Sequence, residues 1–329
     1  MKVLIFGKGK IGRAFFNLLS KRKFKVVFWE KNLDLKNYHF FLGALPGKIG
    51  HLSLEFALKE KKDLIDLSDL EPEFYLERKN EIKKAKITVL ANCGFCPGLL
   101  NFLIAFYTKD LEKIKKIEIL AGTLSPKKKF FFPFLWCLED LILEHQLSSI
   151  HLINKKERKF KPFSNLKREK FFGTLAESYL APSGFEQLMR KIKTENFIFR
   201  VVRPLGFYEF YNFSKNYGLF KRGNFEKIKE ILEKKKENNL TFSKIKIESE
   251  KKNLSLLVKS FSKKDEELNS MQKISCFFPL EMAEKLIKKR IKKGLFFPED
   301  LVKESFSKEV LKKLKNTPLL NFSLKDQPN

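Results

Sequence analysis

The stretch KVLIFGKGKIGRAFFNLLS (Lys2–Ser20) decides the fold of this chain. Its apolar run KVLIF is short and ends at a glycine, which is typical of a strand buried in a sheet. From Ile11 onward, apolar residues recur at the spacing of a helix. The junction reads G-K-G-K-I-G, with glycines at Gly7, Gly9 and Gly12. A G-x-G-x-x-G pattern between a strand and a helix predicts a dinucleotide-binding βα unit.

Each glycine of this loop has a separate physical task. The first permits a tight turn, the second lets the backbone approach a pyrophosphate, and the third lets the helix pack closely on the strand. The phosphates would lie at the helix N-terminus, where backbone N–H groups and the helix dipole favour negative charge. The alternative is a tight turn that binds no ligand. The cofactor-binding residues expected here are Gly7, Lys8, Gly9, Lys10, Ile11 and Gly12.

The residue at the end of the second apolar run indicates which dinucleotide binds. The run KVVFW is followed directly by Glu30, about 20 residues after the glycine loop. A carboxylate at this place accepts hydrogen bonds from the adenosine ribose hydroxyls and repels a 2′-phosphate. Glu30 therefore favours NAD, while the adjacent Lys31 keeps NADP possible. A solvated glutamate at a strand end is the alternative.

Apolar runs and helical patterns alternate through the first third of the chain. This alternation predicts a Rossmann-type, doubly wound parallel sheet in an α/β domain over residues 1–121. Further predicted strands are YHFFLGAL (38–45), DLIDLS (63–68) and KITVLA (86–91). Leu45 and Pro46, in the turn after the third strand, are expected to approach the cofactor. An ordinary Pro-Gly turn is the alternative.

After Gly122 the pattern changes to strands separated by Lys-rich links. The runs KIEILAG, IHLINK, NFIFRVV, KIKIES and NLSLLVKSF predict a mixed sheet. Residues 122–275 are therefore expected to form a second, α+β domain that carries the substrate. Near the end of the chain, residues 279–294 have helical spacing, and Gly294 is expected to end that helix.

The segment ANCGFCPGLLN (Ala91–Asn101) follows the fifth predicted strand, at the edge where open α/β sheets bind ligands. Cys93 and Cys96 have the C-x-x-C spacing of a thiol redox pair. Alternatively, this loop contacts the nicotinamide and its thiols have no redox role. A zinc site would need a second cysteine pair, and Cys137 and Cys276 are isolated, so no metal is expected.

Two motifs together resemble the saccharopine dehydrogenase-like family, and its lysine 6-dehydrogenase branch most of all. They are LPGKIGHLSLEFALKEKKDLIDLSDL (45–70) and NCGFCPGLLNFL (92–103). Fainter similarity continues in AGTL (121–124), LAESYLAPSG (175–184), FRVVRPLG (199–206) and KKGLFFPEDLV (292–302). The resemblance implies that residues 276–329 pack back on the first domain. It also implies an NAD(P)-dependent oxidoreductase that acts on the CH–NH group of an amino acid or an opine-like secondary amine.

The resemblance further implies roles for four catalytic residues. Asn92 and Cys93 would lie beside the nicotinamide, Glu177 would be an acid or base, and Arg203 would anchor a substrate carboxylate. Each role has a structural alternative. Cys93 would be a small buried residue, while Glu177 and Arg203 would form an inter-strand salt bridge or be solvated.

The sequence also departs from the family pattern. Asn92 stands where the family usually has Asp, and Phe207 where it has His. Ser183, Gly184, Phe185 and Glu186 stand where it has Asp-Gly-Leu-Arg. Because an Arg is lost and Glu186 is gained, a polyamine-like or other cationic substrate is an alternative. A catalytically altered relative that binds the cofactor alone is another.

Charge and composition limit the partners. Lys and Arg number 67 against 39 Asp and Glu, a formal charge of +28, but Lys is spread along the chain and interleaved with Glu. No RNA-binding sheet motif or Cys/His finger is present, so nucleic acid is not the expected partner. Four cysteines in 329 residues and no apolar run near the roughly 18 residues of a membrane helix favour a cytoplasmic protein without a membrane partner. A small amine or amino-acid substrate and a homodimer are expected.

Overall fold

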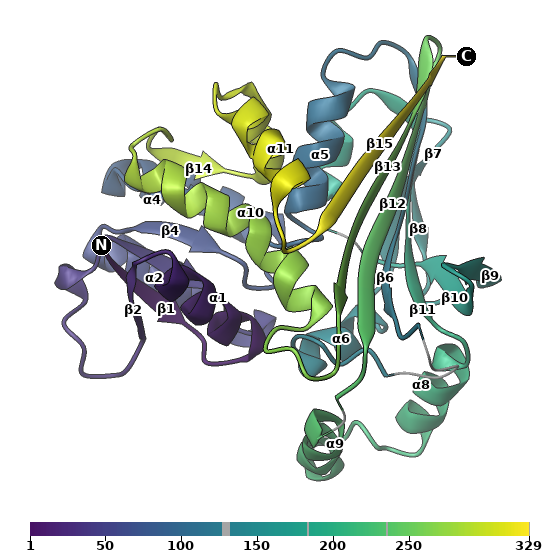
Figure 1. Ribbon diagram of the computed structural model, residues 1–329, viewed down its shortest axis with the longest axis horizontal. Helices are drawn as coiled ribbons and strands as arrows, with labels where there is room; N and C mark the ends of the chain where they lie inside the picture. The colour runs from purple at the N-terminus through teal and green to yellow at the C-terminus, as the bar shows by residue number, and fades with distance from the viewer. Residues whose placement is uncertain (127–131, 183, 235, 329) are drawn as a thin grey trace. The chain divides into compact units, whose positions relative to one another are not determined.

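The chain divides into two compact units in the computed structural model, which describes residues 1–126, 132–182, 184–234 and 236–328 (Figure 1). Unit 1 comprises Met1–Asp110, Ser183–Ile192 and Gln272–Leu319. Unit 2 comprises Leu111–Pro182, Lys193–Met271 and Leu320–Asn329. Ser183, one of the positions where the sequence departs from the family pattern, lies outside the described residues.

Unit 1 contains a six-stranded sheet in the order β14-β5-β4-β3-β1-β2, and all of its strand pairs are parallel. The strands are β1 (Lys2–Phe6), β2 (Lys25–Phe28), β3 (Phe40–Gly43), β4 (Asp63–Asp66), β5 (Thr88–Leu90) and β14 (Gly294–Phe296). The chain leaves β1 toward β2 on one side and then returns to β3 on the other. The loops after β1 and β3 therefore diverge, which creates the switch point where doubly wound sheets bind ligands.

Eight helices belong wholly or mostly to unit 1 in the described structure. They are α1 (Lys10–Lys21), α2 (His51–Glu60), α3 (Pro72–Glu77), α4 (Lys79–Ala85), α5 (Leu99–Thr108), α7 (Glu186–Lys191), α10 (Ser270–Ile287) and α11 (Ser307–Asn316). Short 3₁₀ turns lie at η1 (Leu35–Asn37), η2 (Gly47–Ile49) and η3 (Pro298–Lys303). The central strands are mostly apolar because helices cover both faces of a doubly wound sheet. Phe6 of β1, for example, is buried and stacks on Phe56 of α2 at 5.4 Å between ring centroids. Burying such a side chain contributes about 1.5–3 kcal/mol.

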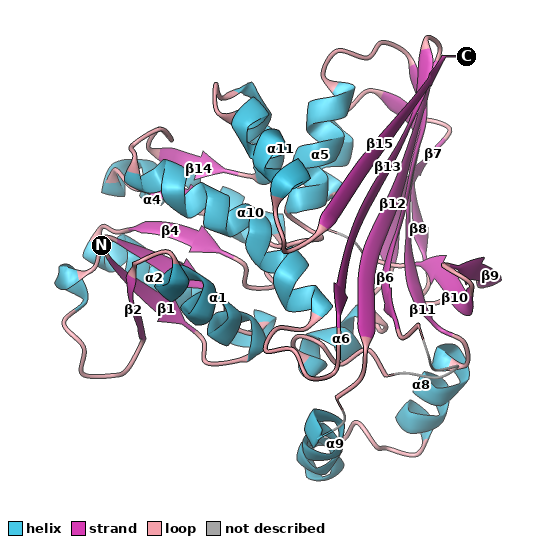
Figure 2. Ribbon diagram, in the orientation of Figure 1, coloured by secondary structure: helices cyan, strands magenta, loops and turns pink. Residues whose placement is uncertain are grey.

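Unit 2 is built on a nine-stranded mixed sheet in the order β15-β13-β12-β6-β11-β10-β9, with β7 paired to β11 and β8 to β7. The strands are β6 (Ile114–Leu124), β7 (Ser149–Ile153), β8 (Lys156–Phe160), β9 (Lys167–Phe171), β10 (Thr174–Leu180), β11 (Thr194–Pro204), β12 (Asn239–Ser249), β13 (Lys252–Ser262) and β15 (Asn321–Pro328). The β11–β6 pair is parallel and the other pairs are antiparallel. Helices α6 (Leu138–Glu144), α8 (Phe207–Asn216) and α9 (Arg222–Lys234) lie at one end of the long strands (Figure 2). A Rossmann-type parallel sheet with a second, mixed-sheet domain is thus confirmed.

The last part of the chain contributes to both sheets. Residues 294–296 form β14 and pair with β5 in unit 1, whereas residues 321–328 form β15 and pair with β13 in unit 2. The prediction that a helix ends at Gly294 is wrong, because α10 ends at Ile287 and Gly294 opens β14. Lys289 adopts a left-handed conformation there (φ 52°), and the Arg290 N–H donates to the Lys285 carbonyl at 2.9 Å, which closes the helix.

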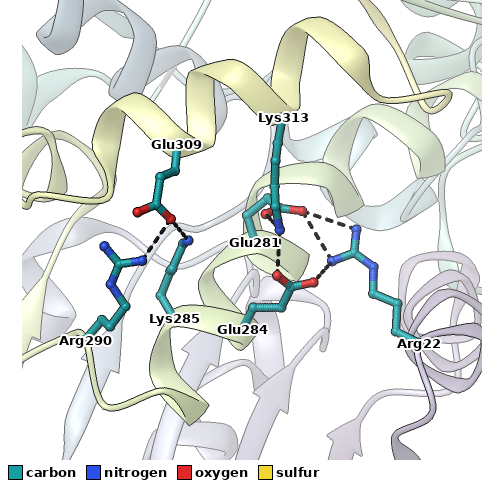
Figure 3. A network of polar contacts seen from close by, with 7 residues as sticks. All are labelled: Arg22, Glu281, Glu284, Lys285, Arg290, Glu309 and Lys313. Atoms are coloured by element: carbon teal, nitrogen blue, oxygen red, sulfur yellow. Dashed lines mark hydrogen bonds and ion pairs between the residues drawn. The ribbon is translucent and has the colours of Figure 1, made fainter.

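An ion-pair network joins α1, α10 and α11 in unit 1 (Figure 3). Glu281 of α10, whose side chain is 2% exposed, pairs with Arg22 at 3.2 Å and with Lys313 at 2.7 Å. The same two cations also pair with Glu284, at 2.8 and 2.6 Å. The buried Lys285 and the partly exposed Arg290 share Glu309 at 2.5 and 2.8 Å. Long polar side chains thus join α10 and α11 to the end of α1, which is distant in sequence.

Of the helices in the described ranges, none combines the length and apolarity needed to cross a membrane.

Replacing Glu281 by Gln should lower the free energy of unfolding by about 1–3 kcal/mol, because a buried carboxylate that is paired with two cations loses its charge. Arg22 and Lys313 keep Glu284 and some contact with water, which limits the loss. Urea unfolding measures the effect. Glu230→Gln is the control, because Glu230 pairs with Lys234 at 2.6 Å on the surface and should cost less than about 1 kcal/mol. Equal costs for both variants would show that the buried network does not stabilise unit 1.

Candidate functional site

Two glycines of the loop Gly7–Gly12 are required by the fold itself. Gly7 follows β1 with φ 110°, and a Cβ there would lie 2.3 Å from the carbonyl oxygen of Ala44. At Gly12 a Cβ would lie 1.9 Å from the Gly7 carbonyl oxygen. Any side chain at either position would overlap with backbone, so β1, α1 and the segment after β3 can meet only around glycine.

Gly9 is different, because the fold does not require a glycine there. It precedes α1 in an extended conformation (φ −72°, ψ −173°), and a Cβ at this position would have no atom within 4 Å. The space beside Gly9 therefore lies open at the N-terminus of a twelve-residue helix. Backbone N–H groups and the helix dipole make such a position a binding site for anionic groups.

The predicted adenosine end of the site carries an ion pair. Glu30, just after β2, accepts from Lys8 of the glycine loop at 2.9 Å, and the two side chains are 67% and 55% exposed. Arg13 of α1 also donates to the Lys8 carbonyl at 2.8 Å, which fixes the loop backbone. Lys31 is exposed beside Glu30. The carboxylate thus lies at the surface, paired with Lys8 across the loop and followed in the chain by Lys31.

The turn after β3 lies next to the glycine loop. The Ala44 N–H donates to the Phe6 carbonyl at 2.8 Å, and the Ala44 carbonyl is the atom that would meet a Gly7 side chain. Leu45 and Pro46 follow directly and are partly exposed. The structure therefore brings Leu45 and Pro46 to the switch point with the predicted glycine-loop residues.

Asp66, at the end of β4, organises this edge of the sheet, although it is not among the residues predicted from the sequence. One of its carboxylate oxygens accepts from the Ser68 N–H at 2.8 Å and the other from the Tyr75 hydroxyl at 3.0 Å. Its carbonyl accepts from the Cys93 N–H at 2.8 Å. Burial raises the pKa of Asp66. The signal in the sequence is the carboxylate that ends the apolar run DLID, which a strand buried on both faces carries only with bonded partners.

The loop after β5, Asn92–Gly98, is tightly held. Asn92 adopts a left-handed conformation (φ 52°), is 6% exposed, and donates from Nδ2 to the Leu70 carbonyl at 2.8 Å. Its Oδ1 is buried and has no hydrogen-bond partner among the described residues. At the other end, the Gly98 N–H donates to Asn101 Oδ1 at 3.0 Å. Asn92 therefore keeps one buried acceptor without a donor at the carboxyl edge of the sheet.

Cys93 is buried, and burial followed by the charge of Asp66 raises the pKa of its thiol. Cys96 is partly exposed, and the two are not joined by a disulfide. A thiol redox pair needs a thiolate, which this environment disfavours. The geometry therefore supports the alternative of Cys93 as a small buried residue whose backbone joins the β5 loop to Asp66. No group of three or more His, Cys, Asp or Glu side chains that could hold a metal occurs in the described part of the chain.

Glu177 and Arg203 lie opposite each other on β10 and β11 of unit 2, in register. Glu177 is fully buried and accepts from the Gly206 and Tyr208 N–H groups, each at 3.0 Å, so it caps the start of α8. Arg203 is 3% exposed and donates to Glu144 of α6 at 2.8 Å. Glu177 and Arg203 do not pair with each other in the described structure; the inter-strand ion pair of Glu177 is with Arg168 of β9, at 3.6 Å.

The two loop glycines should respond differently to alanine. Gly12→Ala should cost about 3 kcal/mol of unfolding free energy, because the new methyl overlaps backbone. Gly9→Ala should change stability by less than about 0.5 kcal/mol, since its backbone angles suit any residue and its surroundings are open. Thermal and urea unfolding of both variants check this. A large loss in Gly9→Ala would mean that the open space at the helix start is required for folding.

Iodoacetamide should alkylate Cys93 at least roughly 100-fold more slowly than Cys96 at about pH 8, because burial suppresses both thiolate formation and access. Mass spectrometry of peptides after timed quenching measures both rates. In urea the two thiols should react alike, which is the control. Fast labelling of Cys93 in the folded protein would restore the redox alternative.

Comparison with known proteins places the fold. No protein-family model and no curated protein matches the sequence. Among solved structures, the chain is similar to apo, histidine-tagged saccharopine dehydrogenase (L-Glu forming) from Saccharomyces cerevisiae, with TM-score 0.76, 15% identity and 99% of each chain covered. An oxidoreductase from Agrobacterium radiobacter in complex with NAD⁺, L-tartaric acid and magnesium has TM-score 0.43 at 8% identity, over 95% of this chain and 93% of that one. DAP dehydrogenase of C. glutamicum in complex with DAP has TM-score 0.45 at 10% identity, over 95% and 98%. The chain therefore has a saccharopine dehydrogenase-like fold, the architecture that its motifs indicated.

Proposed function

We propose that the protein is an NAD-dependent oxidoreductase that acts on the CH–NH group of a small amine or amino acid. The observation that carries the proposal is the open space beside Gly9 at the start of α1. Gly7 and Gly12 are accounted for by packing, whereas the glycine at position 9 is accounted for by a ligand that approaches the backbone. The saccharopine dehydrogenase-like fold supports the same reading.

The residues present fit a dinucleotide. In this proposal Gly9, Lys10 and Ile11 hold the pyrophosphate at the helix N-terminus, and Leu45 and Pro46 border the cofactor at the switch point. Glu30 binds the adenosine ribose. Bound NAD would accept a hydride from the carbon that bears the amine.

The choice between NAD and NADP depends on Glu30 and its two neighbours. Its carboxylate is exposed and opposes a 2′-phosphate, which supports NAD. Lys8 and Lys31 are the cations that NADP would use, so NADP is the second candidate. Because Lys8 pairs with Glu30 at 2.9 Å, a 2′-phosphate would have to compete with this carboxylate for Lys8.

On the substrate side, we assign Asn92 to orientation of the substrate and Cys93 to support of the β5 loop. Asn92 has the open acceptor Oδ1, and Cys93 acts through its backbone N–H to Asp66. Glu177 and Arg203 were expected to be an acid or base and a carboxylate anchor. Since both are engaged in buried contacts, we propose that they shape unit 2 and do not transfer protons.

The engagement of Glu177 and Arg203 also favours a second candidate function. A relative that binds the cofactor without catalysing hydride transfer would keep the glycine loop and Glu30 while its former substrate groups serve the fold. The two candidates agree on NAD binding and differ in turnover.

NADH binding to the full chain should be detectable by its fluorescence, and Gly9→Ala should weaken it at least about tenfold because the methyl fills the space for the pyrophosphate. Gly223→Ala is the matched control, because Gly223 in α9 is also surrounded by open space. Glu30→Ala should shift the preference toward NADPH by roughly tenfold as the repulsion of a 2′-phosphate is removed. Equal affinity of wild type and Gly9→Ala would contradict the proposed site.

Turnover is tested by following NADH formation from NAD with lysine, saccharopine and polyamines. Lysine is included because the motifs are closest to the lysine 6-dehydrogenase branch. A rate with one of these amines that is lost in Gly9→Ala supports the oxidoreductase. NADH binding without turnover of any member supports the cofactor-binding relative.

A further inference from the structure

A group of carboxylates lies where three segments of unit 1 meet. Glu71 and Glu73 stand at the start of α3, and Glu186 is the first residue of α7. The ion pair between Arg190 and Glu73, at 3.1 Å, joins α7 to α3. The segment before α7 is also held against the start of α5, because Asn101 Nδ2 donates to the Gly184 carbonyl at 3.2 Å. Packing is so close there that a Cβ on Gly184 would lie 2.7 Å from Pro97.

Two buried oxygens in this region have no hydrogen-bond donor among the described residues. They are Glu186 Oε2 and Asn92 Oδ1. The orientation of the Asn92 amide follows from its contact with the Leu70 carbonyl, since the group facing a carbonyl oxygen must be the NH₂. The open atom of Asn92 is therefore an acceptor, and it belongs to an amide that is bound to the residue preceding Glu71.

A buried acceptor without a donor is costly, and the nearby charges add to that cost. Burial raises the pKa of Glu186 to about 7; a hydrogen bond from its own backbone N–H opposes this shift, and the charges of Glu71 and Glu73 add to it. Burial and Glu73 also raise the pKa of Glu71. Arg190 opposes the shift at Glu186, but its ion pair is with Glu73. Within the described residues, Glu186 Oε2 and Asn92 Oδ1 thus have no hydrogen-bond donor, and the nearby cation Arg190 is already paired with Glu73.

We infer that Glu71, Asn92 and Glu186, here called the acceptor set, form a subsite for a positively charged amino group of the substrate. An ammonium supplies N–H donors to the two unpartnered oxygens and a positive charge to the two carboxylates. The inference rests on the proposed function and specifies its substrate class as a diamine or polyamine. The reacting nitrogen is neutral during hydride transfer, whereas the nitrogen bound here is a second, remote one.

One neighbouring group offers the opposite chemistry. Gln187, the residue after Glu186, has a buried Nε2 without a hydrogen-bond partner among the described residues, and this donor suits a carboxylate. A substrate with a carboxylate at this end is therefore the rival that an experiment must exclude. The negative charge of Glu71 and Glu186 favours an ammonium over a carboxylate at this position, because the two side chains repel an anion.

Calorimetric titration of the full chain with spermidine and with glutarate tests the subsite, with and without NADH. We expect spermidine to bind, glutarate not to bind, and Glu186→Gln to weaken spermidine binding at least about tenfold. NADH affinity should stay unchanged in Glu186→Gln. The unfolding temperature of ligand-free Glu186→Gln should equal or exceed that of wild type, because a buried carboxylate without a donor is replaced by a neutral amide. If Glu186 had a merely structural role, its replacement by Gln would lower the unfolding temperature.

The matched control is Glu81→Gln, the same change at an exposed position in the first turn of α4, and it should leave spermidine binding unaltered. Glutarate binding, absence of spermidine binding, or equal effects of the two variants would overturn the subsite. Spermidine binding without any NADH binding would instead overturn the proposed function and leave the subsite in place. NADH binding without spermidine binding would overturn the subsite and leave the proposed NAD-dependent function in place.

Discussion

The close contact between β1, α1 and the turn after β3 is the constraint on which the rest of unit 1 depends. At Gly7 the backbone of Ala44 occupies the place of a side chain, and at Gly12 the Gly7 carbonyl does so. No residue with a Cβ fits at either point without moving backbone, so the two glycines fix how the first helix meets the sheet. Gly9 lies between them and has no such neighbour. The same tight turn therefore leaves an open space at the helix N-terminus, where the dipole favours an anion.

Polar groups at the carboxyl edge of the sheet extend this constraint to the loops that follow β4 and β5. Asp66 receives Ser68 and Tyr75 on its carboxylate and Cys93 on its carbonyl, so one buried residue fixes both loops. Asn92 is consequently held with its Nδ2 bonded to the Leu70 carbonyl and its Oδ1 without a donor among the described residues. In unit 2 the opposite holds for the residues that were expected to act on the substrate. Glu177 caps α8 and Arg203 binds Glu144, so their polar contacts serve the fold.

The sequence alone determined the alternation of strands and helices in the first third of the chain. That was possible because a parallel sheet covered on both faces needs continuous apolar runs, and a glycine-rich turn has few other uses between a strand and a helix. The cofactor residues follow for the same reason, since they are local to single turns. The mixed sheet of unit 2 was also visible, although its strand order was not. The end of α10 was misplaced because Lys289, and not a glycine, adopts the left-handed conformation that closes the helix.

Only the tertiary structure decided what the charged residues do. Glu177, Arg203 and Glu186 each look available in the sequence, but burial and hydrogen bonding depend on neighbours that are distant along the chain. Glu177 meets the backbone at Gly206 and Tyr208, whereas Glu186 comes under the charges of Glu71 and Glu73 and keeps an unpartnered oxygen. Local patterns specify backbone shape because they act through adjacent dihedral angles. The protonation and partners of a side chain are set by desolvation and by contacts across space, which no local pattern records.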